Sequence, residues 1–120
     1  MVADQYATRL TVQEWRNLER TSDVKHEYID GYVYAMAGGS RAHSRIAANV
    51  MGLLDTAFGN GPCIAYNSDL ATRVSATRFT YAGVVVSCSD RDQATRDETE
   101  IVEPCVIFEV LSDSTEFKDR

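Results

Sequence analysis

The chain lacks long apolar runs and has few prolines. Two prolines among 120 residues exclude collagen-like and proline-rich disordered chains. No apolar run approaches the roughly 20 residues that a membrane-spanning helix needs, and Met1-Val2-Ala3-Asp4 lacks the basic and apolar regions of a signal peptide. We therefore expect a cytoplasmic protein without a membrane partner, built as a single domain over residues 1–120.

Basic residues are also scarce. Twelve Lys and Arg against eighteen Asp and Glu give a formal net charge of −6, and an acidic surface binds polyanions poorly because phosphate contacts need concentrated positive charge. A nuclease is still compatible with this charge, since its metal site is itself acidic. Any DNA contact then requires a local basic face or a second subunit.

Common cofactor and nucleophile motifs are missing from the sequence. It has no Gly-rich phosphate loop, no Gly-x-Ser-x-Gly elbow and no paired zinc-ligand spacing. Its cysteines are odd in number, form no Cys-x-x-Cys pair and lie mostly in apolar runs: Cys63, Cys88 and Cys105. We expect buried, reduced thiols; a zinc site and a catalytic thiol are the alternatives.

Local patterns predict an α+β domain with a mixed sheet. A capping box of Thr11 and Glu14 begins a helix that ends near Arg20. Asp30-Gly31 forms the turn of a hairpin over residues 26–36, in which Glu27 lies opposite Tyr34. Strands are expected over 63–75, 79–88 and 102–111, and the charged stretch 89–100 is expected to be a solvated loop. Helical spacing predicts the longest helix over residues 40–58. Its expected buried stripe consists of Ala42, Ile46, Val50, Leu53, Ala57 and Phe58, widened by Ala47 and Leu54.

Glu109 is the most informative residue, because it interrupts the apolar run Cys105-Val106-Ile107-Phe108-Glu109-Val110-Leu111. An unpaired buried carboxylate is costly, so this position predicts a metal ion, a cation or a strand end open to water. A structural ion pair with an arginine such as Arg73 is the alternative explanation.

Three further polar residues have simple structural explanations. Asp69 lies on the polar side of the strand predicted over 63–75, Glu27 faces solvent on the hairpin, and His43 stands in the first turn of the long helix. Each residue is more common in such a place as a surface side chain than as a ligand.

Five short motifs follow one another along the chain: Glu27-Tyr28-Ile29-Asp30-Gly31, Met36-Ala37-Gly38, His43-Ser44-Arg45-Ile46-Ala47-Ala48-Asn49, Asn67-Ser68-Asp69 and Phe108-Glu109-Val110-Leu111-Ser112. In this order they resemble the restriction-endonuclease-like proteins of domain-of-unknown-function family 820, over nearly the whole chain. The resemblance implies a PD-(D/E)xK nuclease fold, in which an Asp and a Glu on neighbouring strands hold Mg²⁺ or Mn²⁺ for phosphodiester hydrolysis of DNA. It implies that Glu109 is that Glu, and that Glu27 and His43 line the site.

Two features depart from the family pattern. The family's strand reads Tyr-Pro-Asp-Val where this chain has Tyr81-Ala82-Gly83-Val84, so Gly83 replaces the metal-binding aspartate, with Asp69 as a candidate substitute. Leu111 occupies the Lys position of Glu-x-Lys. The family's lysine follows an Asp-Arg pair, whereas this sequence ends with that pair at Arg120, and Lys118 precedes it.

These departures predict a degenerate nuclease domain, truncated at its C-terminus, with catalysis impaired or absent. The loss of covering C-terminal elements predicts a homodimer or another homo-oligomer. Three hypotheses compete: an active Mg²⁺-dependent endonuclease that takes a lysine from a partner chain, an inactive oligomeric or interaction domain of the same fold, and a small α+β domain unrelated to the family.

Overall fold

The computed structural model describes residues 2–3, 9–95 and 97–110. Two α-helices, one 3₁₀ helix and nine strands alternate along this part of the chain. The helices are α1 (Val12–Thr21), α2 (Arg41–Phe58) and η1 (Asp90–Asp92). The strands are β1 (Val2–Ala3), β2 (His26–Ile29), β3 (Tyr32–Ala35), β4 (Ile64–Asn67), β5 (Ala71–Ser75), β6 (Arg78–Thr80), β7 (Val84–Ser87), β8 (Glu100–Ile101) and β9 (Pro104–Phe108).

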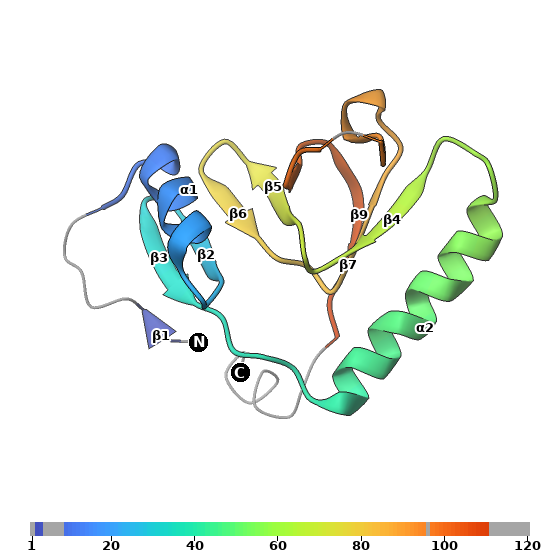
Figure 1. Cartoon of the computed structure of the whole chain (residues 1–120), viewed down its shortest axis with the longest axis horizontal. Helices are drawn as coiled ribbons and strands as arrows, with labels where there is room; N and C mark the ends of the chain where they lie inside the picture. Colours follow the sequence, from blue (N-terminus) through green and yellow to red (C-terminus); the bar gives the residue numbers. More distant parts are fainter. Residues whose placement is uncertain (1, 4–8, 96, 111–120) are drawn as a thin grey trace.

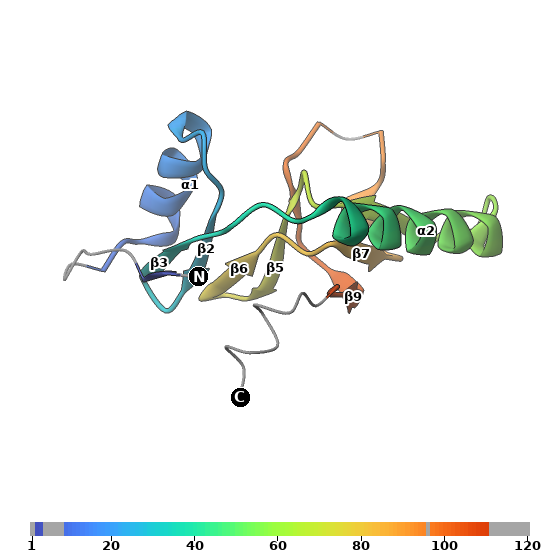
Figure 2. The same ribbon diagram turned by 90° about the horizontal axis from the view of Figure 1, so that it is seen from below.

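The strands form two sheets, each with one helix packed against it (Figures 1 and 2). The larger sheet has the order β1-β3-β2-β6-β5-β8, and it is mixed because β5 and β8 run parallel while its other pairs are antiparallel. The smaller sheet has the order β4-β7-β9 and is antiparallel throughout. The predicted α+β class with a mixed sheet is confirmed.

The N-terminal helix and the hairpin form as the sequence predicts. Thr11 accepts from the backbone N–H of Glu14, and the Glu14 carboxylate accepts from the N–H of Thr11, so the capping box is complete. Asp30 and Gly31 have φ values of 50° and 94°, as a type I′ turn requires. The predicted pairing of Glu27 with Tyr34 is confirmed. The face of the hairpin that carries Tyr28 and Val33 packs on α1. The shared core consists of Trp15, Tyr28, Val33, Ala71 and Phe79.

The long helix has the predicted bounds, and part of its predicted stripe is packed against the smaller sheet. Its N-cap is Ser40, and Gly59 ends it with a φ of 54°. Ile46 and Leu53 of the predicted stripe are 48% and 73% exposed. The face against β4 and β7 consists of Ala47, Val50, Met51, Leu54 and Phe58, and of these only Met51 lies outside the predicted stripe. Neither α-helix in the described part of the chain is long and apolar enough to cross a membrane.

Two of the three predicted long strands are wrong, because each of these two is a pair of short strands. Residues 63–75 form β4 and β5, and residues 79–88 fall in β6 and β7, whereas the strand predicted over 102–111 forms as the single, shorter strand β9. In each of the two pairs, the first strand lies in one sheet and the second in the other. Apolar content alone does not reveal such a break, because both halves are buried against different layers.

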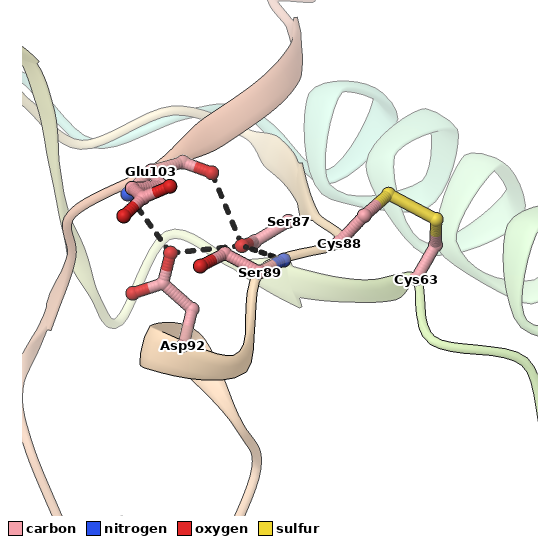
Figure 3. The surroundings of a disulfide bond; sticks show 6 residues. All are labelled: Cys63, Ser87, Cys88, Ser89, Asp92 and Glu103. Carbon is pink, nitrogen blue, oxygen red and sulfur yellow. Dashed lines mark hydrogen bonds between the residues drawn. A yellow bond between two sulfur atoms is a disulfide. The ribbon is translucent and has the colours of Figure 1, made fainter.

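The expected reduced thiols are also wrong for two of the three cysteines, and the expected burial is wrong for the third. Cys63 and Cys88 form a disulfide between the ends of β4 and β7, one residue beyond the pair of Ile64 and Ser87 (Figure 3). The third cysteine, Cys105, is free and exposed on β9. Strand pairing brings the two sulfurs together although 25 residues separate them in the sequence.

The charged stretch after β7 is less solvated than predicted, because it is anchored by a buried carboxylate. Asp92 is 6% exposed and accepts from the Ser87 hydroxyl at 2.8 Å (Figure 3). It also accepts from the backbone N–H groups of Val102 and Glu103, each at 2.9 Å. These bonds tie the start of the stretch to the segment that enters β9, and they satisfy a carboxylate that would otherwise be costly to bury.

Candidate functional site

Glu109 directly follows β9, at the edge of the small sheet. Continuing the antiparallel pairing of Val84 with Phe108 by one residue places Gly83 opposite Glu109. Side chains directly opposite in an antiparallel pair project from the same face, so a side chain at position 83 would share the face of Glu109. A Cβ added to Gly83 would lie 3.4 Å from the Phe108 carbonyl oxygen, which is a close but tolerable contact.

Glu27 lies on β2 of the larger sheet, on the face opposite α1. Its neighbours Tyr28 and Val33 are 5% exposed and pack under the helix. Because side chains alternate along a strand, Glu27 and its partner Tyr34 project from the other face. The glutamate is half-buried there, so the prediction that it simply faces solvent is wrong.

His43 stands in the first turn of α2, as predicted, and its imidazole contacts the chain just after Glu109. Its backbone N–H donates to Oγ of the N-cap Ser40 at 3.1 Å, and its Nε2 donates to the carbonyl oxygen of Val110. A Cβ on Gly39 would overlap the imidazole Nδ1. Gly39 therefore leaves the space that this histidine conformation needs, a role that no sequence motif indicates.

Glu27, His43 and Glu109 interact electrostatically, although they come from three different elements. Burial raises the pKa of Glu109 above its ordinary range, the negative charge of Glu27 raises this pKa further, and His43 lowers it. The Glu109 side chain still has an exposed side, so water or an ion can reach it. Two carboxylates that repel each other beside an open surface are a suitable environment for a cation.

The Glu109 carboxyl should titrate at lower pH in Glu27→Gln and at higher pH in His43→Gln. Because its folded-state pKa is raised, the stability that protonated Glu109 contributes is present at low pH and is lost as the pH rises through the raised value. Carbon-detected NMR of the Glu109 side-chain carboxyl measures the titration. Asp55→Asn removes a carboxylate that does not contribute to this pKa and should leave it unchanged. An unaltered Glu109 titration in Glu27→Gln would contradict the interaction of Glu27 with Glu109.

Asp69 does not lie with these residues. It falls in the turn between β4 and β5, where its backbone N–H donates to Oδ1 of Asn67 at 2.9 Å, so the prediction of a strand position is wrong. Its side chain lines a cavity of about 370 Å³ between α1 and the larger sheet, together with Trp15 and Glu19. The lining of this cavity does not include Glu27, His43 or Glu109.

The described residues offer carboxylates to a divalent ion but no complete cage. No group of three His, Cys, Asp or Glu side chains in residues 2–3, 9–95 and 97–110 is arranged to hold a metal. Mg²⁺ is commonly bound by one or two carboxylates, with water and substrate phosphates completing the coordination. Glu27 and Glu109 are two carboxylates of the kind that such an ion uses.

Comparison with known proteins relates the chain to one family. The profile of the family Uma2, described as "Putative restriction endonuclease", matches residues 12–120. The uncharacterized protein slr1290 of Synechocystis sp. strain Kazusa is 40% identical over 114 residues, which are 93% of this chain and 58% of that protein. The uncharacterized protein sll1609 of the same organism is 27% identical over 112 residues, which are 92% of this chain and 63% of that protein.

The chain thus spans about three-fifths of the length of both relatives, 58% of one and 63% of the other. No solved structure matches it.

Proposed function

The chain belongs to the Uma2 family of restriction-endonuclease-like proteins, and from this membership we propose that it carries a degenerate Mg²⁺-dependent site for phosphodiester hydrolysis of DNA. One observation carries the proposal: the negative charge of Glu27 on β2 adds to burial in raising the pKa of Glu109 after β9. A domain with no function at this place would gain stability by separating the two charges.

Glu27 and Glu109 are the residues that would hold Mg²⁺ or Mn²⁺. Their mutual repulsion is the interaction that a cation relieves, and their oxygens are ligands that hard divalent ions prefer. When bound, the ion would polarise the scissile phosphate and lower the pKa of the attacking water.

His43 acts as a positioning residue in this proposal. Its imidazole donates to the Val110 carbonyl, and that contact holds the backbone that follows Glu109. Its charge, when protonated, also favours the ionised form of Glu109, which is the form that binds a cation.

We propose that catalysis is impaired for two reasons. Gly83 lies opposite Glu109 and offers no side chain where the family has its aspartate. In the described part of the chain the single lysine is Lys25, whose Nζ donates to the Ser68 carbonyl oxygen and lies 5.1 Å from the centre of the Tyr81 ring. Tyr81 and Lys25 line the cavity on the α1 side, so this lysine lies apart from the site of Glu27 and Glu109. Lys118 lies outside the described residues.

Plasmid nicking in Mg²⁺ or Mn²⁺ tests the proposal, with Glu109→Gln as the matched control. We expect cleavage near background for the natural sequence. Cleavage at ordinary nuclease rates that Glu109→Gln abolishes would show that the site is intact, and it would support the active-endonuclease hypothesis instead.

The second candidate function is that of a non-catalytic oligomeric or interaction domain, and exposed apolar side chains favour it. Leu53 and Ile46 on α2 are 73% and 48% exposed, and Val106 on β9 is 44% exposed. Burying such side chains between two copies is favourable, so we propose a homo-oligomer. Light scattering should give at least twice the monomer mass, and Leu53→Lys should reduce it; a monomer at high concentration would contradict oligomer formation.

A further inference from the structure

We propose that the face of the larger sheet that carries Glu27 binds single-stranded DNA through two tyrosines and two arginines. We call this set the tyrosine strip; it consists of Arg9, Tyr32, Tyr34 and Arg78. The inference rests on the proposed function and deepens it, because it assigns the substrate class as unpaired rather than duplex DNA.

Strand pairing places both tyrosines on the same face as Glu27. Tyr32 and Tyr34 are two residues apart on β3, so their side chains project in the same direction. Tyr34 lies opposite Glu27, and Tyr32 lies opposite Ile29. In the next strand Arg78 lies opposite Ile29 as well. The strip therefore has members on β3 and β6, on either side of β2, and it includes Tyr34, the partner of Glu27.

This face of the sheet is accessible. Tyr32, at the start of β3 beside the hairpin turn, is 42% exposed, and Arg78 is also exposed. Figure 2 shows α1 on one side of β2, β3 and β6, and no helix of the described residues on the other side. A ligand can thus lie along the strands without displacing any described element.

Arg9 reaches Tyr32 by packing over Gly31 of the hairpin turn. Its guanidinium carbon lies 5.1 Å from the centre of the Tyr32 ring, which is a cation–π distance. A Cβ on Gly31 would lie 2.9 Å from the Arg9 Cβ, so the glycine that makes the turn also lets the arginine cross it. The result is an exposed aromatic ring with a positive charge over one of its faces.

The chemistry of the strip fits unpaired bases. Aromatic rings bind nucleic acid by stacking on base faces, which a duplex keeps covered, and sequence matters little because every base has such a face. Asp30 acts electrostatically on Arg9, and the whole chain is acidic, so the strip is too weakly charged to hold a duplex by its phosphates alone. A strand stacked on Tyr34 would pass directly beside Glu27.

Fluorescence anisotropy with a labelled 12-nucleotide single strand, and with the same sequence as a duplex, tests the inference. The measurements are made in EDTA, so that binding is separated from metal-dependent hydrolysis. We expect the single strand to bind more tightly than the duplex. With about two phosphates neutralised, the affinity should fall with salt with a logarithmic slope of about −1.4.

Tyr32→Ala should weaken single-strand binding roughly 5- to 100-fold, because one stacked base is lost. Tyr32→Leu should weaken it similarly, whereas Tyr32→Phe should retain it, and circular dichroism establishes that each variant is folded. Arg20→Ala removes a positive charge from α1, on the opposite side of the sheet, and should leave binding unchanged.

The proposal that the strip binds single-stranded DNA would be overturned by either of two results. One is duplex binding that is equal or tighter; the other is Tyr32→Ala and Tyr32→Leu proteins that bind the single strand like the natural sequence. Neither result touches the carboxylate pair, which is tested by Mg²⁺ binding and nicking. Conversely, tyrosine-dependent strand binding without any Mg²⁺ response would retain the strip and remove the proposed hydrolytic function.

Discussion

Gly83→Asp is expected to raise the affinity for Mg²⁺ by about 10- to 100-fold, since it completes the carboxylate set beside Glu109. Position 83 lies opposite Glu109 in the continued β7–β9 pairing. The closest atom to an added Cβ is the Phe108 carbonyl oxygen at 3.4 Å, so the side chain fits after a small adjustment. Because Gly83 does not have a positive φ, the aspartate also meets no backbone strain.

Calorimetric titration with Mg²⁺ measures this gain, and plasmid nicking shows whether catalysis follows. Gly83→Asn has nearly the same shape without the charge, and should gain much less. Gly52→Asp adds a carboxylate on α2, where nothing lies within 4 Å of the new Cβ, and should gain nothing. A folded Gly83→Asp protein with unchanged affinity would contradict the correspondence of Gly83 with the family's aspartate.

Loss of the Cys63–Cys88 disulfide is expected to lower the free energy of unfolding by about 3 kcal/mol, from the closure of a loop of this size in the unfolded chain. The bond spans a sequence separation of 25 residues and joins β4 to β7. Since α2 packs on both of these strands, the loss should be felt by the whole smaller sheet.

Urea unfolding with and without a thiol reductant measures this contribution. Cys63→Ser should unfold at lower urea concentration and should no longer respond to the reductant. Cys105→Ser changes the free, exposed cysteine and should behave like the natural sequence. Three alkylatable thiols in the unreduced protein would contradict the disulfide.

Elements fixed by neighbouring residues were predicted correctly from the sequence. The capping box of α1 depends on two residues three positions apart, and the hairpin depends on the positive φ that Asp30 and Gly31 tolerate. Both signals are local, so no knowledge of the packing partners was needed. The pairing of Glu27 with Tyr34 followed from the turn alone.

Features set by distant parts of the chain were not predictable in this way. The division of residues 79–88 between two sheets depends on which layers cover each half. The exposed Ile46 and Leu53 have the same spacing as the buried residues of α2, so periodicity did not distinguish the two faces. Likewise, the sulfurs of Cys63 and Cys88 meet only after β4 and β7 pair.

The candidate site was predictable in part. A glutamate in an apolar run drew attention to Glu109 on physical grounds, whereas Glu27 and His43 came from the family resemblance, and the electrostatics now relate all three. The contribution of Gly39 depends on the direction of one imidazole ring, which no sequence pattern indicates. The roles of these residues remain proposals that the variants above test.

Glu27 belongs to the six-stranded sheet, whereas Glu109 extends from a strand of the three-stranded sheet. The distance between the two carboxylates therefore depends on how the sheets are oriented about the connections at residues 68–70 and 81–83. A core substitution far from both glutamates can widen or narrow this distance by tilting one sheet, and a bound divalent ion would resist the tilt. Interior substitutions that change the relative orientation of the two sheets would therefore alter the affinity for the ion, although they contact neither glutamate.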